Sequence, residues 1–277
     1  MKVKNAAWPR RLNEISVVRM VKNITDLSGR VAVVIGGTSG LGRAIAIGLA
    51  ESGADVVPSG RRKEMADSVC TEIEKLGRRT LRHGVDVGKR ESIDELRDIV
   101  VKELGHVDIL VNAAGRTFRQ QAKDLSEKDW HAVIDTNLTG MLRACQSFYE
   151  PLKKSGHGRV VNIASLASFV AWYDVVAYNV SKMGVLSLTQ TLAIEWARDN
   201  IIVNALAPGV FPTDINATVL HGTARGKEIL MRTPMRRFGR PEEVASAAVF
   251  LASDAVSFIT GTTIAIDGGY LCSGVNS

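Results

Sequence analysis

The sequence predicts an α/β fold, a single doubly wound domain in which helices flank a seven-stranded, mostly parallel sheet. The first observation is that short apolar runs alternate along the chain with amphipathic stretches, the pattern of βαβ units with right-handed crossovers. The second is that several runs consist of consecutive Val and Ile, which is typical of strands covered on both faces. The third is composition, because 45% of the 277 residues are hydrophobic and only 5% are aromatic, which suits close packing of helices on a sheet.

Seven apolar runs are the predicted strands. They span residues 30–36, 54–60, 80–87, 107–112, 158–164, 200–207 and 263–267. Pro58 disagrees with this prediction, because it lies inside the second run and has no N–H to donate to a neighbouring strand. We therefore expect that strand to fray at its carboxyl end.

The stretches between the runs are the predicted helices. The clearest cover residues 41–52, 63–76, 93–104, 127–152 and 241–252. The sequence contains no repeat, low-complexity tract or Pro/Gly-rich linker that would divide this pattern. We therefore expect one domain over residues 26–277, preceded by an N-terminal extension, residues 1–25.

The formal charge of +6 is concentrated at the N-terminus. Residues 1–22 contain six Lys and Arg against one acid, Glu14, which is +5 and leaves +1 for the other 255 residues. A nearly neutral body without a basic stripe argues against a nucleic-acid partner. The charge is typical of a solvated tail.

The cysteines and the hydropathy pattern indicate the compartment. Cys70, Cys145 and Cys272 are widely spaced and form no disulfide framework or zinc motif, so we expect free thiols and no metal site. Charged and polar residues interrupt the N-terminus, and no apolar run reaches the length of a membrane span. The sequence therefore predicts a cytoplasmic protein that does not interact with membranes.

A glycine-rich turn follows the first predicted strand and precedes a helix. It has the spacing Gly-x-x-x-Gly-x-Gly, and its candidate cofactor-binding residues are Gly36, Thr38, Ser39, Gly40, Leu41 and Gly42. Such glycines permit the tight turn and the close approach of a pyrophosphate to a helix N-terminus. No Gly-Lys-Ser/Thr follows, which argues against a nucleoside-triphosphate loop.

The end of the second strand indicates which dinucleotide binds. An acid at this position would accept hydrogen bonds from the adenosine ribose and favour NAD. The sequence has Arg61 and Arg62 instead, and the guanidinium of Arg61 suits a 2′-phosphate. We therefore favour NADP(H), with NAD(H) as the alternative. The two arginines could also have no ligand and simply begin the next helix at the surface.

Tyr178 and Lys182 are the predicted catalytic pair. They are four residues apart in a helical pattern and therefore share one face of the helix. We expect the Lys182 ammonium to lower the pKa of the Tyr178 phenol. Tyr178 could then donate a proton to a carbonyl oxygen as hydride arrives, or accept one in the reverse direction.

Further polar residues are predicted at the same edge of the sheet. Ser165 follows the strand at 158–164, and Asn112, Ala113 and Gly115 end another strand, where open α/β sheets bind ligands. Asn137 lies within a helical stretch, which is unfavourable for an Asn without a specific partner. Each residue alone could have a purely structural role, such as a turn residue for Ser165 or a buried polar group with internal hydrogen bonds for Asn137. Together they indicate an active site.

These motifs resemble the short-chain dehydrogenase/reductase family over about residues 27–271. The matching features, in order, are the glycine turn, the segment 112–115, a serine thirteen residues before the Tyr-x-x-x-Lys pair, Pro208-Gly209, and Asp267-Gly268-Gly269. The resemblance implies a Rossmann-like fold and an oxidoreductase that interconverts a secondary alcohol and a ketone.

The resemblance also implies roles for residues. Asn137, Ser165, Tyr178 and Lys182 would form the catalytic tetrad, in which Ser165 orients the carbonyl, Lys182 also binds the nicotinamide ribose, and Asn137 holds a water of the proton relay. Asp86 and Val87 would contact adenine. Pro208, Gly209, Val210 and Thr213 would line the nicotinamide site. Members are commonly homotetramers that assemble through the helices around Asn137 and Tyr178.

The substrate is the least determined part of the prediction. Arg116, Arg119, Trp172 and Phe211 are candidate substrate residues, and the arginines could bind a carboxylate. The C-terminal part resembles the gluconate 5-dehydrogenase group, so the leading hypothesis is a sugar-acid or polyol oxidoreductase. A 3-oxoacyl-thioester reductase is the alternative, with Arg119, Arg236 and Arg237 as a basic patch for an acyl-carrier protein. The third hypothesis is a catalytically silent nucleotide sensor or scaffold.

Overall fold

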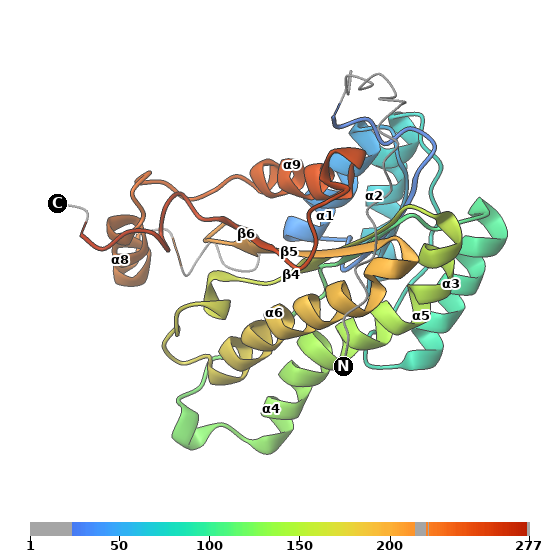
Figure 1. Ribbon diagram of the computed structural model, residues 1–277. Coiled ribbons are helices and arrows are strands. Elements are labelled where there is room, and N and C mark those ends of the chain that lie inside the picture. Colours follow the sequence, from blue (N-terminus) through green and yellow to red (C-terminus); the bar gives the residue numbers. More distant parts are fainter. Residues whose placement is uncertain (1–23, 214–219, 221, 276–277) are drawn as a thin grey trace, which may run out of the picture.

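The computed structural model describes residues 24–213, 220 and 222–275, so most of the predicted N-terminal extension lies outside the described residues. A parallel sheet forms the centre of this part of the chain (Figure 1). Its strands, in spatial order, are β2 (Asp55–Ser59), β1 (Val31–Ile35), β3 (Ile109–Asn112), β4 (Gly158–Ile163), β5 (Ile201–Pro208) and β6 (Thr263–Ile266). The predicted α/β fold class is confirmed, and every strand pair is parallel.

The sheet has six strands within the described residues, not the predicted seven. The run at residues 80–87 is not a strand. Two backbone hydrogen bonds join the two neighbouring segments, from the Val56 N–H of β2 to the carbonyl of Arg79, just before the run, and from the Val85 N–H to the carbonyl of Gly60, just after β2. Its apolar residues are nevertheless used, since Val85 and Val87 are buried in the core. The segment is therefore apolar because it contributes to the core, although it does not pair as a strand.

Pro58 does not end its strand, and the expected fraying is wrong. β2 continues through Pro58 to Ser59, which pairs with Ile35 of β1. β2 is an edge strand, and its Asp55 N–H and Ser59 carbonyl hydrogen-bond towards β1. Because side orientation alternates along a strand, the Pro58 nitrogen faces the open edge, where no ladder hydrogen bond is required.

The helices agree closely with the predicted stretches. Those on either side of the sheet are α1 (Gly40–Glu51), α2 (Lys63–Lys75), α3 (Arg90–Leu104), α5 (Gly140–Ser155), α6 (Val176–Trp196) and α9 (Pro241–Ala252). α4 (Glu127–Ile134) leads into α5 through a π-helical turn, η2 (Asp135–Thr139). α8 (Ala224–Arg232) lies away from the sheet, near the C-terminal segment (Figure 1).

Alternating side chains of the strands build two cores. Val31, Val33 and Ile35 of β1 pack with α3, α5 and α6, whereas Ala32 and Val34 pack with α1, α2 and α9. Figure 1 shows these two helical layers on opposite faces of the sheet. A sheet covered on both faces explains the consecutive apolar residues of its strands.

The strand order locates the candidate site. The chain passes from β1 outward to β2 and then to β3 on the other side of β1, which makes the carboxyl ends of β1 and β3 a topological switch point. Ligands of doubly wound sheets bind in the crevice at this point. Among the described helices, none is long and apolar enough to cross a membrane.

Candidate active site

The glycine turn packs tightly against the end of β3. Gly36 has φ +86°, and a Cβ there would overlap the backbone of Ala113 and Ala114. A Cβ at Gly42 would overlap the Gly36 carbonyl oxygen. Only glycine fits at both positions, so the turn brings the N-terminus of α1 directly to the switch point.

The N-terminus of α1 is available to an anion. Ser39 is the N-cap residue with an extended backbone, yet its hydroxyl does not cap the helix, and the first turn contains no acid. The first backbone N–H groups of a helix carry partial positive charge and lack partners within the helix. The turn and the helix end therefore fit the pyrophosphate of a dinucleotide.

The two arginines after β2 are both exposed, but they differ in their contacts. Arg62 Nη2 lies 3.5 Å from Ser39 Oγ, so this side chain reaches the glycine turn. Arg61 makes no hydrogen bond or ion pair to any described residue and is available to a ligand. Arg62 is a phosphate-binding candidate that the sequence analysis did not select.

Three other predicted segments surround the turn. Thr213, after β5, lies 3.5 Å from the position of a Cβ on Gly40, and a Cβ on Gly115 would lie 3.8 Å from Lys182 Nζ. Pro208 pairs with Ile266 of β6, and the Gly209 N–H donates to the Ile266 carbonyl at 2.8 Å. These contacts place the loops after β3 and β5 beside the glycine turn and the catalytic helix.

Asp86, Val87 and Asn112 are held by the protein itself. Asp86 Oδ1 accepts a hydrogen bond from the Gly88 N–H at 3.0 Å, and Val87 is buried. Asn112 Nδ2 donates to Asn162 Oδ1 at 2.9 Å inside the core. The Asn112 side chain therefore stabilises the pairing of β3 with β4, and a direct contact of Asn112 with the cofactor stays a prediction.

Tyr178 and Lys182 lie on the same face of α6, as predicted. Lys182 Nζ is 5.7 Å from the centre of the Tyr178 ring and donates to the Ile163 carbonyl at the end of β4, at 2.6 Å. Lys182 is 4% exposed. This buried ammonium therefore links the catalytic helix to the carboxyl edge of the sheet.

Burial governs the acidity of both groups. It lowers the pKa of Lys182 to about 8, and it raises the pKa of Tyr178 above its usual value, an effect that a hydrogen bond with Ser165 partly offsets. The net shift of the Tyr178 pKa is therefore opposite to the predicted lowering, since desolvation of the phenolate dominates. Tyr178 is a neutral phenol at neutral pH and can act as an acid.

Ser165 follows β4 and starts a short 3₁₀-helix, η3 (Leu166–Ser168). Its Oγ accepts a hydrogen bond from the Ala167 N–H at 3.1 Å and interacts with Tyr178. Since the Ala167 N–H uses one lone pair of Oγ, the hydroxyl is held at the start of η3 and keeps its proton to donate. This arrangement suits the orientation of a carbonyl oxygen.

Asn137 lies fully buried in the π-helical turn η2. Its side chain accepts from the Arg116 N–H at 2.8 Å and donates to the Arg116 carbonyl at 2.9 Å and to Ser181 Oγ at 3.0 Å. Both ends of the amide are thus bonded to protein groups. Asn137 therefore fixes the loop after β3 against α6, and the water-holding role that the resemblance implied stays a prediction.

The four candidate substrate residues are not all in one place. Arg116 is exposed, with its backbone held by Asn137, and Arg119 Nη2 lies 3.6 Å from Asp174 Oδ2. Trp172 lies in the loop between Ser165 and Tyr178. Phe211 is buried and packs against Gly239, at a pocket of about 360 Å³ after β5 and β6.

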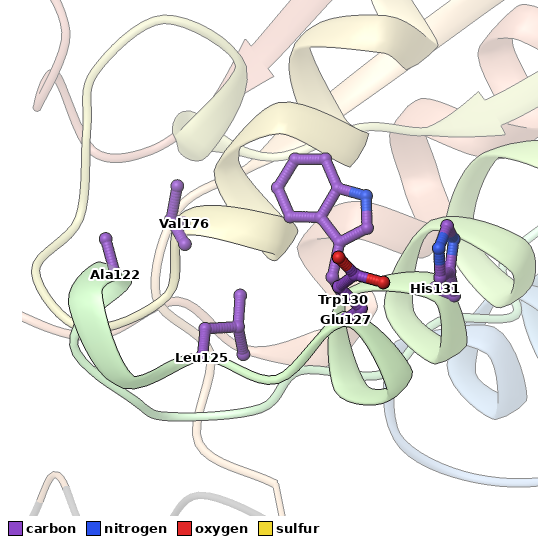
Figure 2. A pocket seen from close by; sticks show the side chains of 6 residues that line it. All are labelled: Ala122, Leu125, Glu127, Trp130, His131 and Val176. Carbon is purple, nitrogen blue, oxygen red and sulfur yellow. The ribbon is translucent and has the colours of Figure 1, made fainter.

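A second hollow, of about 530 Å³, lies between α4 and the start of α6. Figure 2 shows Ala122, Leu125 and Val176 on one side of it and the α4 residues Trp130 and His131 on the other. None of its six lining residues belongs to the tetrad. The hollow is therefore adjacent to the catalytic helix without containing its reactive groups.

Comparison with known proteins is consistent with this geometry. A family model described as enoyl-(acyl carrier protein) reductase matches residues 35–271, which contain the glycine turn and all four tetrad residues. The chain belongs to the short-chain dehydrogenase/reductase family. It is therefore an oxidoreductase with an NAD(P)-binding Rossmann fold that acts on CH–OH groups.

Several members of this family are similar over nearly their full length. The 2-dehydro-3-deoxy-D-gluconate 5-dehydrogenase of Escherichia coli is 40% identical over 91% of this chain and 99% of that protein. The NAD-dependent glycerol dehydrogenase of Listeria innocua is 41% identical over 90% of this chain and 95% of that protein. The crystal structure of a gluconate 5-dehydrogenase from Burkholderia cenocepacia, in complex with NADP and tartrate, is 33% identical with a TM-score of 0.87, over 91% of this chain and 98% of that one.

Proposed function

We propose that this short-chain dehydrogenase/reductase is an NADP-preferring oxidoreductase that interconverts a ketone and a secondary alcohol of a sugar acid or polyol. The observation that carries the proposal is the position of Arg119, which pairs with Asp174 in the loop that joins Ser165 to Tyr178. A cation at this point is suited to an anionic substrate. The relatives support the substrate class, because those from Escherichia coli and Listeria innocua are named for a sugar acid and a polyol.

The chain's own residues handle the oxygen and the proton of this reaction. The Ser165 hydroxyl orients the substrate carbonyl, and the neutral Tyr178 phenol donates a proton to its oxygen. The nicotinamide, when bound, supplies the hydride in reduction and accepts it in oxidation. Lys182 holds the nicotinamide ribose, and Gly36, Gly40 and the N-terminus of α1 hold the pyrophosphate.

The alternative, reduction of a 3-oxoacyl thioester, requires a basic patch for an acyl-carrier protein. Arg237 is already bonded to the Glu243 carboxylate at 2.9 and 2.7 Å, and Arg236 Nη1 donates to the Met231 carbonyl at 2.9 Å. The Glu243 carboxylate compensates the charge of Arg237, as Asp174 does for Arg119, whereas the Met231 carbonyl leaves the charge of Arg236 in place. The assay of both substrate classes therefore decides between the two proposals.

The homotetramer implied by the resemblance stays a prediction. Val180, Met183 and Ile194 lie on one face of α6 and are 41%, 57% and 80% exposed. An apolar stripe of this kind fits an interface between copies of the chain. The division into an extension and a single domain also stays a prediction.

Cofactor consumption by the purified protein tests the proposed function. We expect turnover of 5-ketogluconate with NADPH, and little or no turnover of an acetoacetyl thioester under the same conditions. Tyr178→Phe protein is the control for contaminating activity. Turnover of the thioester alone would replace the proposal with fatty-acid-type reduction, and silence on all sugar acids and polyols would contradict it.

Changing Arg61→Asp should shift the cofactor preference. We expect the ratio of kcat/KM for NADPH to that for NADH to fall by roughly 10- to 100-fold, because a charge-assisted interaction with the 2′-phosphate is replaced by repulsion. Arg198→Asp makes the same charge change at an exposed position in η4 (Ala197–Asp199), remote from the glycine turn. An unchanged ratio in Arg61→Asp protein would contradict the role of Arg61.

A further inference from the structure

Four loops at the carboxyl edge of the sheet meet around Trp172. Arg119 follows β3, Trp172 follows β4, Arg225 begins α8 after β5, and Tyr270 follows β6. Asn179, the neighbour of Tyr178, donates from Nδ2 to the Trp172 carbonyl at 2.9 Å. The cluster is therefore tied directly to the catalytic helix.

Arg225 is held by stacking and not by a counter-ion. Its Cζ lies 5.6 Å from the centre of a Trp172 ring, and Trp172 stacks on Tyr270 at 6.0 Å with an interplanar angle of 18°. The half-buried guanidinium forms no hydrogen bond and no ion pair in the part of the chain that the structure describes. A cation–π contact of this kind orients the guanidinium but leaves its N–H donors free.

The cluster has an excess of positive charge. Arg225 and Arg119 repel each other, and this repulsion adds to burial in lowering the pKa of Arg225. Asp174 compensates only partly, since it is already paired with Arg119, and Glu228 pairs with Arg232 at 3.1 Å. A ligand carboxylate would relieve this imbalance.

Unpaired hydrogen-bonding atoms lie in the same loop. Trp172 Nε1 and Asp174 Oδ1 are buried and have no partner among the described atoms. Leaving such groups unpaired costs free energy, which a ligand that rearranges the loop and bonds them would recover. A donor and an acceptor together match the hydroxyl groups of a sugar derivative, whereas an alkyl chain would leave both unpaired.

We propose that Arg225 binds the carboxylate of a sugar-acid substrate, with Trp172 fixing the guanidinium by stacking and Arg119 as the second cation. This inference rests on the proposed function. It assigns the specificity of the enzyme for acidic substrates to one residue on α8. Arg225 is thus a determinant of the preference for a sugar acid over the neutral polyol of the same length. Its stacking on Trp172 joins the first turn of α8 to the loop between Ser165 and Tyr178.

Binding of gluconate to the NADP-loaded protein, measured by calorimetry, tests the inference independently of turnover. We expect Arg225→Gln to raise the Kd for gluconate by roughly 10- to 100-fold, because a charge-assisted pair is lost. Arg225→Lys should also weaken binding, since lysine keeps the charge without the planar fork that stacks. Lys227→Gln removes an equal charge from an exposed position of α8, on a different face, and should leave the Kd unchanged.

The possible outcomes separate the inference from the proposed function. Unweakened gluconate binding by Arg225→Gln protein, or no gluconate binding by the wild type, would overturn the assignment of Arg225. Equal NADP affinity and equal Tm in the variants would show that folding is preserved. If the wild type binds gluconate through Arg225 and turns over no sugar acid, the proposed function fails and the carboxylate site remains.

Discussion

Replacing Tyr178→Phe is expected to lower turnover by roughly 100- to 10,000-fold, the range associated with loss of a general acid. The ring of Tyr178 packs beside Lys182, and phenylalanine keeps that ring while removing the hydroxyl that interacts with Ser165. The substrate oxygen then has no proton donor in this position. The effect should appear in kcat as well as in kcat/KM, because the proton is transferred in the transition state.

Cofactor affinity distinguishes loss of this proton from loss of the site. The predicted pyrophosphate site consists of the glycine turn and the N-terminus of α1 and does not include the phenol, so NADPH binding measured by fluorescence should change little in Tyr178→Phe protein. Tyr149→Phe is the matched control. Tyr149 lies on α5, which carries no tetrad residue, and its hydroxyl donates to Asp199 Oδ2 at 2.7 Å. Activity near the wild-type level in Tyr178→Phe protein would contradict the assignment of the acid.

The parts of the fold that the sequence predicted are those in which a local pattern and the tertiary environment agree. β1 is apolar and flanked by helices on both faces, so its burial is visible in the sequence. Residues 80–87 show the limit, because Val85 and Val87 are apolar for packing although the segment forms no ladder. Pro58 shows another, since its tolerance depends on β2 being at the edge of the sheet, which is a property of topology.

The same distinction applies to the site. Tyr178 and Lys182 were predictable as a pair because four residues of helix set their geometry. The π-helical turn that carries Asn137 was not, because a local shift in backbone hydrogen bonding leaves no periodic trace in the sequence. The sequence also did not indicate Arg62 and Arg225 as candidate ligand contacts, since their positions depend on how loops distant in sequence pack together.

The substitution Lys182→Met is expected to abolish most of the activity. It should also remove the free-energy cost of burying the charge of Lys182 in the folded protein. Lys182 is buried, with its Nζ beside the predicted ribose site, so its loss should remove both cofactor contact and catalysis. Burial lowers its pKa from an ordinary value of 10.5 to about 8. At neutral pH the folded protein therefore holds a charged group in an environment that disfavours the charge, at a cost of about 3 kcal/mol.

The pH dependence of unfolding gives this cost a distinct signature. Between pH 8 and pH 10.5 the unfolded chain binds the lysine proton more tightly than the folded protein, so stability from this group rises as the pH increases. Lys182→Met protein lacks that gain. The free energy of unfolding of the variant minus that of the wild type should fall by about 2–3 kcal/mol between pH 7 and pH 10.

Urea unfolding at a fixed protein concentration, at several pH values, measures this difference. Lys102→Met is the matched control, because it makes the same substitution at a side chain that is 80% exposed. A difference between variant and wild type that stays constant from pH 7 to pH 10 would contradict the depressed pKa of Lys182. If the difference falls with pH and the variant is inactive, the Lys182 ammonium is required for catalysis and destabilises the fold at neutral pH. Such a trade-off between activity and stability is expected at a functional site.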